Sequence, residues 1–398
     1  MNGPVAGSRW DAPAQATTIR SKNLIETHLR VAPSRDGGDF AGQARAAYEE
    51  LGRQLRGIGA TPADIVTEKI FLSDLPSQAE PLSAIRRAFH TTSAAPAGVP
   101  PAVTLVQQPP AAAGRWCEIQ TVVMQPSGNG ELARRPLRGL PPGATGMLVT
   151  EGDLRHVFLS GVAPGEPTDD DGFQRQAFSL FELAEACLSR EEFSFGDVVR
   201  TWIYLADVDS DYGYLNLARR DFFTSRRIEP PPASTGIRGV PHPAGSSCGL
   251  DLRAIGGGAA RPGIRPIRAA TMNEAPEYGA DFSRGTRVDL PDRAVIHLSG
   301  TASVDNDGCV VHPGSSEGQL NRMLLNVEEL LAGQGTDPSS IVSAVTYLKH
   351  ADDLALFREI AARRGFRETF PNTIVVTDIC RTGWLCEIEA VAVLGASG

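Results

Sequence analysis

The sequence predicts an α/β protein made of three tandem copies of one module, which close into a ring with pseudo-threefold symmetry. Two observations lead to this fold class. Short motifs recur at three places along the 398 residues with nearly constant spacing, as in proteins built from internal repeats. Each of the three segments also alternates amphipathic helical patterns with short apolar strands, which favours a sheet with helices packed on it.

Changes in composition give the expected boundaries. Residues 1–22 are rich in Ala, Pro, Ser and Thr, and we expect them to be disordered. Residues 126–144 and 257–271 contain several prolines and glycines and lack hydrophobic periodicity, so we expect them to be linkers. The three modules are therefore expected at residues 23–125, 145–256 and 272–398.

The repeated motifs lie near the ends of expected strands. An aromatic residue followed by leucine ends an apolar strand in each module: Phe71-Leu72, Tyr204-Leu205 and Tyr347-Leu348. The last strand of each module carries an acidic residue: Glu118, Asp251 and Glu387. Asp251 lies 133 residues after Glu118, and Glu387 lies 136 residues after Asp251. This near-constant spacing predicts that the three acids occupy equivalent positions.

The third segment indicates the elements of a module most clearly. Apolar residues recur at helical spacing from Leu320 to Leu331. Residues 341–348 are rich in β-branched residues and predict a strand. A second helix follows, and residues 373–380 and 385–394 are expected to be strands. The order β-β-α-β-α-β-β predicts a mixed sheet with helices on one face, whose other face is covered by the other two modules.

Composition also limits the partners. The net charge of -9 argues against binding of nucleic acid, because such proteins gather Lys and Arg on one face. No apolar run is long enough to cross a bilayer, and no secretory signal is visible. The six cysteines and the histidines have no metal-ligand spacing, and no glycine-rich phosphate loop is present. We expect a cytoplasmic protein with no metal and no organic cofactor, which forms a monomer or a dimer of single-chain rings.

These motifs resemble the Rid (reactive intermediate deaminase, YjgF-like) family over nearly the whole folded chain. The similarity rests on Ser299-Gly300 after an early strand, on the Tyr-Leu strand end, and on Glu-Ile-Glu-Ala at 387–390. The resemblance implies a chorismate-mutase-like α+β module and small-molecule sites in the clefts between modules. It also implies that Tyr278 is the tyrosine of such a site.

The second module is also similar to chorismatases, which belong to the same superfamily and split pyruvate from chorismate. This similarity rests on Arg-Thr-Trp-Ile-Tyr at 200–204 and Pro-Ala-Ser-Thr-Gly at 232–236. It implies a small-molecule enzyme of secondary metabolism that acts on an enol ether, enamine or imine. The alternative is a Rid-like binding or interaction protein whose catalytic groups have been lost.

One difference from the Rid family bears on the reaction. Members that hydrolyse imines carry an arginine after the proline that precedes the penultimate strand, and this arginine binds the substrate carboxylate. The matching positions here are Val103, Ser234 and Asn372. None of these side chains can form the bidentate pair that a guanidinium forms with a carboxylate, so ordinary 2-iminoacid deamination is not expected.

The candidate catalytic acids lie on the last strands. Glu387 and Glu389 share one face of their strand, where mutual repulsion can raise one pKa and create a proton donor. A pair of acids neutralised by interior arginines is the structural alternative. Asp251 shares a face with Arg253, either as an internal salt bridge or as a catalytic acid that Arg253 holds. We expect Glu387 to be the catalytic acid, with Asp251 as the second candidate.

The first module has Leu29-Arg30 where the others have Ser-Gly. We expect this arginine to fill its cleft and the module to serve partly as a scaffold. The residues expected to bind substrate are Tyr278, Ser299, Gly300, Asn372, Tyr347, Arg381, Tyr204, Arg200 and Thr235.

Overall fold

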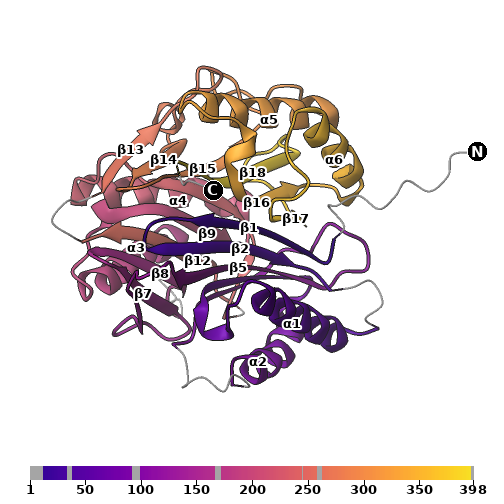
Figure 1. Ribbon diagram of the computed structural model, residues 1–398. Coiled ribbons are helices and arrows are strands. Elements are labelled where there is room, and N and C mark those ends of the chain that lie inside the picture. The colour runs from indigo at the N-terminus through magenta and orange to yellow at the C-terminus, as the bar shows by residue number, and fades with distance from the viewer. Residues whose placement is uncertain are drawn as a thin grey trace, which may run out of the picture.

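Three mixed sheets meet at the centre of the molecule, and the helices lie on the outside (Figure 1). The computed structural model describes residues 12–33, 38–91, 99–165, 172–243, 245–257 and 262–395. Each sheet has six strands, and each module contributes two long helices. This is the α/β architecture of three tandem Rid-like modules that the repeats predict.

The three modules repeat one order of elements. The first contains β1 (Ala14–Arg20), β2 (Leu24–Val31), α1 (Phe40–Gly57), β3 (Ile65–Leu72), α2 (Leu75–Thr91), β4 (Ala102–Gln107) and β5 (Cys117–Pro126). The second contains β6 (Leu132–Pro136), β7 (Thr145–Glu151), β8 (Leu154–Val162), α3 (Phe173–Ser189), β9 (Val198–Leu205), α4 (Val208–Arg226), β10 (Ala233–Arg238), β11 (Val240–Pro241) and β12 (Cys248–Gly256). The third contains β13 (Gly263–Ile267), the 3-10 turn η4 (Ala275–Tyr278), β14 (Gly285–Asp289), β15 (Ala294–Ala302), α5 (Ser316–Ala332), β16 (Ile341–Leu348), α6 (Leu354–Arg363), β17 (Asn372–Val376) and β18 (Cys386–Leu394).

Three segments expected to be disordered or to be linkers contain strands instead. Strand β1 lies within residues 1–22 and pairs antiparallel with β2. Strand β6 lies within 126–144 and pairs with β7, and β13 lies within 257–271 and pairs with β14. These strands lie at sheet edges, where Pro, Gly and Arg are tolerated and hydrophobic alternation is weak. Their hydrogen-bonding partners, rather than their own composition, make them strands.

Contacts between sheets link each module to the other two. The short strand β11 of the second module pairs with β4 of the first. Strand β10 of the second module contacts β15 of the third, and Ala233 forms a parallel bridge with Ser283. The third module meets the first where Gln120 Nε2 donates to the Ala344 carbonyl oxygen at 2.8 Å. The sheet faces that carry no helices are therefore covered by neighbouring modules.

Strand pairing changes the expected equivalence of the three acids. Cys117, Cys248 and Cys386 pair with the leucines that end the neighbouring strands: Leu72, Leu205 and Leu348. The next residues on the last strands, Glu118, Gly249 and Glu387, are therefore equivalent. Asp251 is equivalent to Gln120 and Glu389, so the equivalence of Asp251 with Glu387 was wrong by two residues. A shift of two keeps a side chain on the same face of a strand, which is why the sequence pattern hides it.

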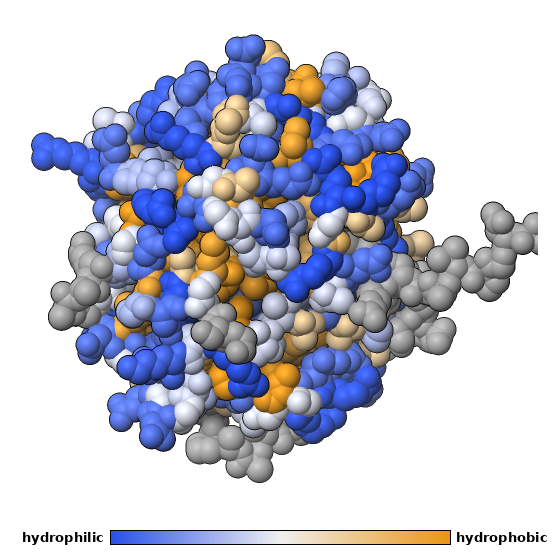
Figure 2. Space-filling model, turned by 45° about the horizontal axis from the view of Figure 1, so that its top comes forward, coloured by the Kyte–Doolittle hydropathy of each residue, from blue (hydrophilic) through white to orange (hydrophobic). Residues whose placement is uncertain are grey.

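The two faces of β18 differ as the alternation predicts. Cys386, Ile388 and Ala390 are buried in the hydrophobic core of the third module with α5 and α6. Glu387 and Glu389 point to the opposite face. The exterior visible in Figure 2 is mostly hydrophilic, with smaller apolar patches between the charged groups. None of the described helices is long and apolar enough to span a membrane.

Candidate active site

Glu387 lies in a cleft between the second and third modules. Strand β18 presents its carboxyl group next to Gly300 of β15, and the side chain is buried. A Cβ atom at position 300 would lie 1.9 Å from Glu387 Oε1. A larger residue at position 300 would therefore force the Glu387 carboxyl group to move.

Burial gives Glu387 the properties of a proton donor. Removal from water raises the pKa of this carboxyl to about 8, and the negative charge of Glu389 acts in the same direction. The positive charges of Arg200 and Arg284 lower it, with smaller effect. At neutral pH the carboxyl is therefore mostly protonated.

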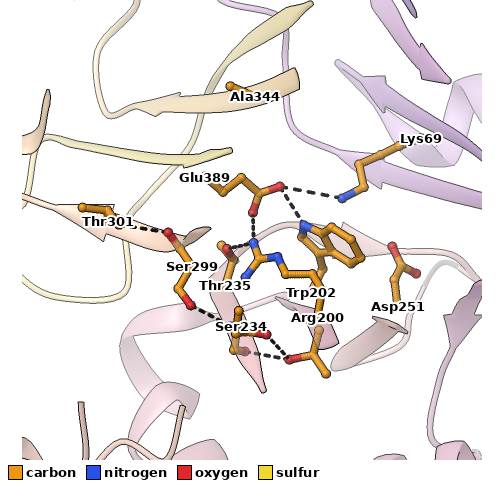
Figure 3. Close-up of polar contacts among 12 residues, drawn as sticks. Lys69, Arg200, Trp202, Ser234, Thr235, Asp251, Ser299, Thr301, Ala344 and Glu389 are labelled. Atoms are coloured by element: carbon orange, nitrogen blue, oxygen red, sulfur yellow. Dashed lines mark hydrogen bonds and ion pairs between the residues drawn. The ribbon is translucent and has the colours of Figure 1, made fainter. Parts of the chain in front are cut away.

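Glu389 is held by three groups at the centre of the ring (Figure 3). Arg200 Nη2 and Trp202 Nε1 each donate a hydrogen bond of 2.7 Å to its carboxylate. The Lys69 ammonium lies 4.0 Å from it. Glu389 is therefore tied to donor groups of the first and second modules, whereas the carboxyl of Glu387 lines the cleft.

Aromatic rings and cations form the walls of the Glu387 cleft. The Arg381 guanidinium stacks on the Tyr278 ring at 4.0 Å from its centroid. Arg284 lies 5.2 Å from the same ring and is fixed by the Asn273 carbonyl oxygen, to which it donates at 2.7 Å. Trp384 lines the cleft, and its buried Nε1 has no hydrogen-bond partner among the described residues. The volume of the cleft is about 20 Å³, so its walls lie close together in this structure.

The second module supplies the opposite wall. Ser234 of β10, one of the positions where imine-hydrolysing Rid proteins have arginine, lines the cleft together with Tyr212 and Gly236. A guanidinium nevertheless lies behind this serine, because Arg219 of α4 is buried and its Nη1 is 3.4 Å from Ser234 Oγ. Arg219 therefore places positive charge near this position from a helix, whereas the arginine of the imine-hydrolysing proteins lies on the strand.

The other two clefts differ at the position of Glu387. In the first module Arg30 donates to both oxygens of Glu118 at 2.8 and 2.6 Å, and Arg115 donates to the same carboxylate at 2.7 Å. The arginine therefore fills this cleft, as the sequence predicts. In the second module Gly249 occupies the equivalent position, but the carboxyl of Asp251, two residues further along the strand, lines that cleft beside Gly161.

Asp251 belongs to a hydrogen-bonded network between the first and second modules. It accepts hydrogen bonds from Thr104 Oγ1 at 2.6 Å, from the Gly161 amide at 2.9 Å and from Tyr204 Oη at 3.2 Å. Burial raises the pKa of this carboxyl, whereas Lys69 lowers it. Among the described residues no salt bridge joins Asp251 to Arg253. The Arg253 guanidinium instead lies 3.8 Å from the carboxylate of Glu26.

The structure brings together only part of the expected site. Glu387, Tyr278, Gly300 and Arg381 meet at one cleft. The other expected residues lie elsewhere or behind the cleft: Asp251, Asn372, Tyr204, Arg200, Thr235, Tyr347 and Ser299.

The positions of these remaining residues have specific causes. Asn372 lies on β17 and accepts a hydrogen bond from Thr346 Oγ1 at 3.1 Å, away from the Glu387 cleft. Arg200 lies beside Glu389 and donates to Thr235 (Figure 3), whose methyl group approaches Gly300. Tyr347 lies on β16, opposite Glu387 of β18. Ser299 Oγ accepts from the Ser234 amide at 2.9 Å and so ties β15 to β10.

Sequence reasoning missed five residues that line the cleft or hold its charges: Tyr212, Phe282, Arg284, Cys380 and Trp384. Four of them lie in loops and turns, which carry no periodic signal, and Tyr212 comes from a helix of another module. Among the described residues, no group of three or more His, Cys, Asp or Glu is placed to hold a metal ion.

Comparisons with known proteins agree with this architecture. Residues 272–394 match the family described as Endoribonuclease L-PSP. A 3-hydroxybenzoate synthase of Streptomyces hygroscopicus is 25% identical over 264 residues, which cover 60% of this chain and 74% of that protein. A crystal structure of a chorismatase matches with a TM-score of 0.58 and 17% identity, covering 83% of this chain and 93% of that chain. The chain is a tandem of three Rid-like modules, and its third module matches the Endoribonuclease L-PSP family.

Proposed function

We propose that this protein is a chorismatase-like enzyme of secondary metabolism that acts on a cyclic enol-ether carboxylate in the cleft between its second and third modules. The observation that carries the proposal is the buried carboxyl of Glu387, whose pKa of about 8 keeps it protonated at neutral pH. An acid with a pKa near the working pH is the most effective general acid.

The reaction would begin with proton transfer from Glu387 to the terminal methylene carbon of the enol ether. The neighbouring carbon then carries positive charge that its ether oxygen shares. Attack by water, with loss of one proton, gives a hemiketal, which collapses to an alcohol and a 2-oxo acid. A nucleophilic group of the substrate itself can attack in place of water, and the ring product then differs from the alcohol that hydrolysis gives.

The cleft walls fit the two parts of such a substrate. The guanidinium groups of Arg284 and Arg381 can bind carboxylates, and the rings of Tyr278 and Trp384 can contact an unsaturated ring. Burial raises the pKa of Tyr278, so its hydroxyl stays a hydrogen-bond donor. The matched relatives, a 3-hydroxybenzoate synthase and a chorismatase, support chorismate as the first compound to test.

The chain would carry one active site. Arg30 pairs with the acid of the first module. In the second module Gly249 stands at the position of Glu387, and the acid that lines this cleft, Asp251, is held by three hydrogen bonds. Only the third module combines the acid, the close-approach glycine at 300 and Tyr278. Titration calorimetry with a non-reacting analogue should therefore give one ligand per chain.

The test is the release of pyruvate from chorismate, followed with lactate dehydrogenase and NADH. We expect turnover by the native protein, a large loss in Glu387→Gln, and little change per folded molecule in Glu118→Gln, which alters the equivalent residue of the filled cleft. If chorismate binds tightly at the cleft and no enol-ether or enamine carboxylate is turned over, the protein is a binding protein instead.

A further inference from the structure

A second cavity lies where the three sheets meet, and it shares no lining residue with the Glu387 cleft. Its volume is about 110 Å³, roughly the liquid volume of four water molecules. Each module contributes polar side chains to it, including Lys69 from the first, Arg200 and Arg253 from the second, and His297 from the third.

Several buried donors around this axial cavity have no partner. Arg200 Nη1, Arg253 Nε and both ring nitrogens of His297 are buried and make no hydrogen bond with the described residues. All three side chains are at most 6% exposed. The Lys69 ammonium is 4.0 Å from Glu389 and lies over the Trp202 ring. Because an unsatisfied buried polar group costs about 1–3 kcal/mol, so many in one place indicate a partner in the cavity.

The acceptors that line the cavity are already engaged. Glu389 accepts from Arg200 and Trp202 (Figure 3), and Asp251 accepts from three donors of the surrounding strands. Glu68 is paired with Arg86 and His90. The unused hydrogen-bonding capacity therefore includes the guanidinium donors of Arg200 and Arg253 and one N–H of the His297 ring, which favours a ligand that offers acceptors.

The lining also includes apolar side chains from all three modules, among the hydroxyl groups of Thr67, Thr121, Ser160 and Ser343: Val122, Phe158, Leu159, Leu298, Val345 and Val391. An inorganic anion carries charge on all sides, so part of its charged surface would contact these apolar side chains, which is unfavourable. A ligand with a carboxylate at one end and a short hydrocarbon part at the other satisfies both kinds of lining.

We propose that the axial cavity binds a small organic monocarboxylate of about three or four carbons, whose oxygens accept hydrogen bonds from Lys69, Arg200, Arg253 and His297. This site is distinct from the Glu387 cleft and does not depend on the function proposed for it.

The first test titrates the full chain with propionate in a calorimeter. Propionamide, which has nearly the same shape and no charge, is the matched ligand control. We expect one propionate per chain and no detectable binding of propionamide. Lys69→Met should weaken propionate binding at least tenfold, because it removes the charge and keeps the length of the side chain. Lys349→Met, which changes a half-exposed lysine on the surface, should bind propionate as the native chain does.

A second variant keeps the test decisive if Lys69→Met fails to fold. His297→Phe places phenylalanine where the second module already has Phe158, since His297 pairs with Val391 as Phe158 pairs with Arg253. We expect it to fold, by its melting temperature, and to bind propionate several-fold more weakly. Arg381→Met, in the other cleft, should leave propionate binding unchanged.

Three results would overturn the proposal. The native chain would show no binding of millimolar propionate if the cavity holds only ordered water. Both cavity variants, Lys69→Met and His297→Phe, would bind as tightly as the native chain if the ligand lies elsewhere. Loss of binding in Arg381→Met alone would assign the carboxylate to the Glu387 cleft. None of these results depends on turnover of chorismate, so the two proposals fail separately.

Discussion

Replacing Glu387 by glutamine tests the proton-donor role directly, because glutamine has almost the same shape and cannot supply an acidic proton. We expect kcat to fall by roughly 10²–10⁴-fold, the usual contribution of a positioned general acid. The native rate should stay level below neutrality and fall as the pH rises through about 8, where Glu387 loses its proton. The variant's residual rate should lack this decline.

The same substitution should change how stability depends on pH. The pKa of Glu387 rises from 4.5 to about 8 on folding, so between these values the folded chain keeps a proton that the unfolded chain has lost. The native protein therefore loses stability as the pH rises through this window, by ~1.4 kcal/mol per pH unit for a single group. The whole pKa shift corresponds to a loss of stability of at most about 5 kcal/mol. The measured loss should be smaller, because the fold relaxes around a buried charge.

Urea denaturation of both proteins at several pH values measures this effect. We expect the stability of Glu387→Gln, relative to the native chain, to increase from pH 5 to pH 9. Equal pH dependence of the two proteins would show that Glu387 ionises normally and would refute the reasoning. Full turnover in the variant would place the catalytic acid elsewhere.

The other predictions concern the clefts, the ring and its partners. Arg30→Ala should destabilise the fold by about 3–5 kcal/mol in urea denaturation, because it leaves the buried Glu118 with one cation fewer; an unchanged midpoint would contradict the pairing. Gly300→Ala should abolish turnover, since its Cβ would collide with Glu387, whereas Gly213→Ala, which meets nothing within 4 Å, should not. Light scattering should report one chain or two per particle, and an obligate trimer of chains would disprove single-chain closure. Filter binding should detect no tight, salt-sensitive RNA complex, as the net charge of -9 predicts.

The sequence alone determined the repeat and the faces of its strands. Recurring motifs predicted three modules, and alternation along 386–390 predicted that Glu387 and Glu389 point away from the helices. Both signals are local, because a strand repeats every two residues and a helix every 3.6 residues. The replacement of Ser-Gly by Leu29-Arg30 likewise predicted a filled cleft, since a large cation beside an acid forms a pair.

Tertiary structure decided the register, the edge strands and the composition of the cleft. A shift of two residues leaves every side chain on its face, so only pairing with β9 shows that Gly249, not Asp251, is equivalent to Glu387. Strands β1, β6 and β13 exist because a neighbouring strand hydrogen-bonds to them, which their own composition does not indicate. Arg284 and Tyr212 reach Glu387 from different modules because the ring closes, and closure joins residues far apart in the chain.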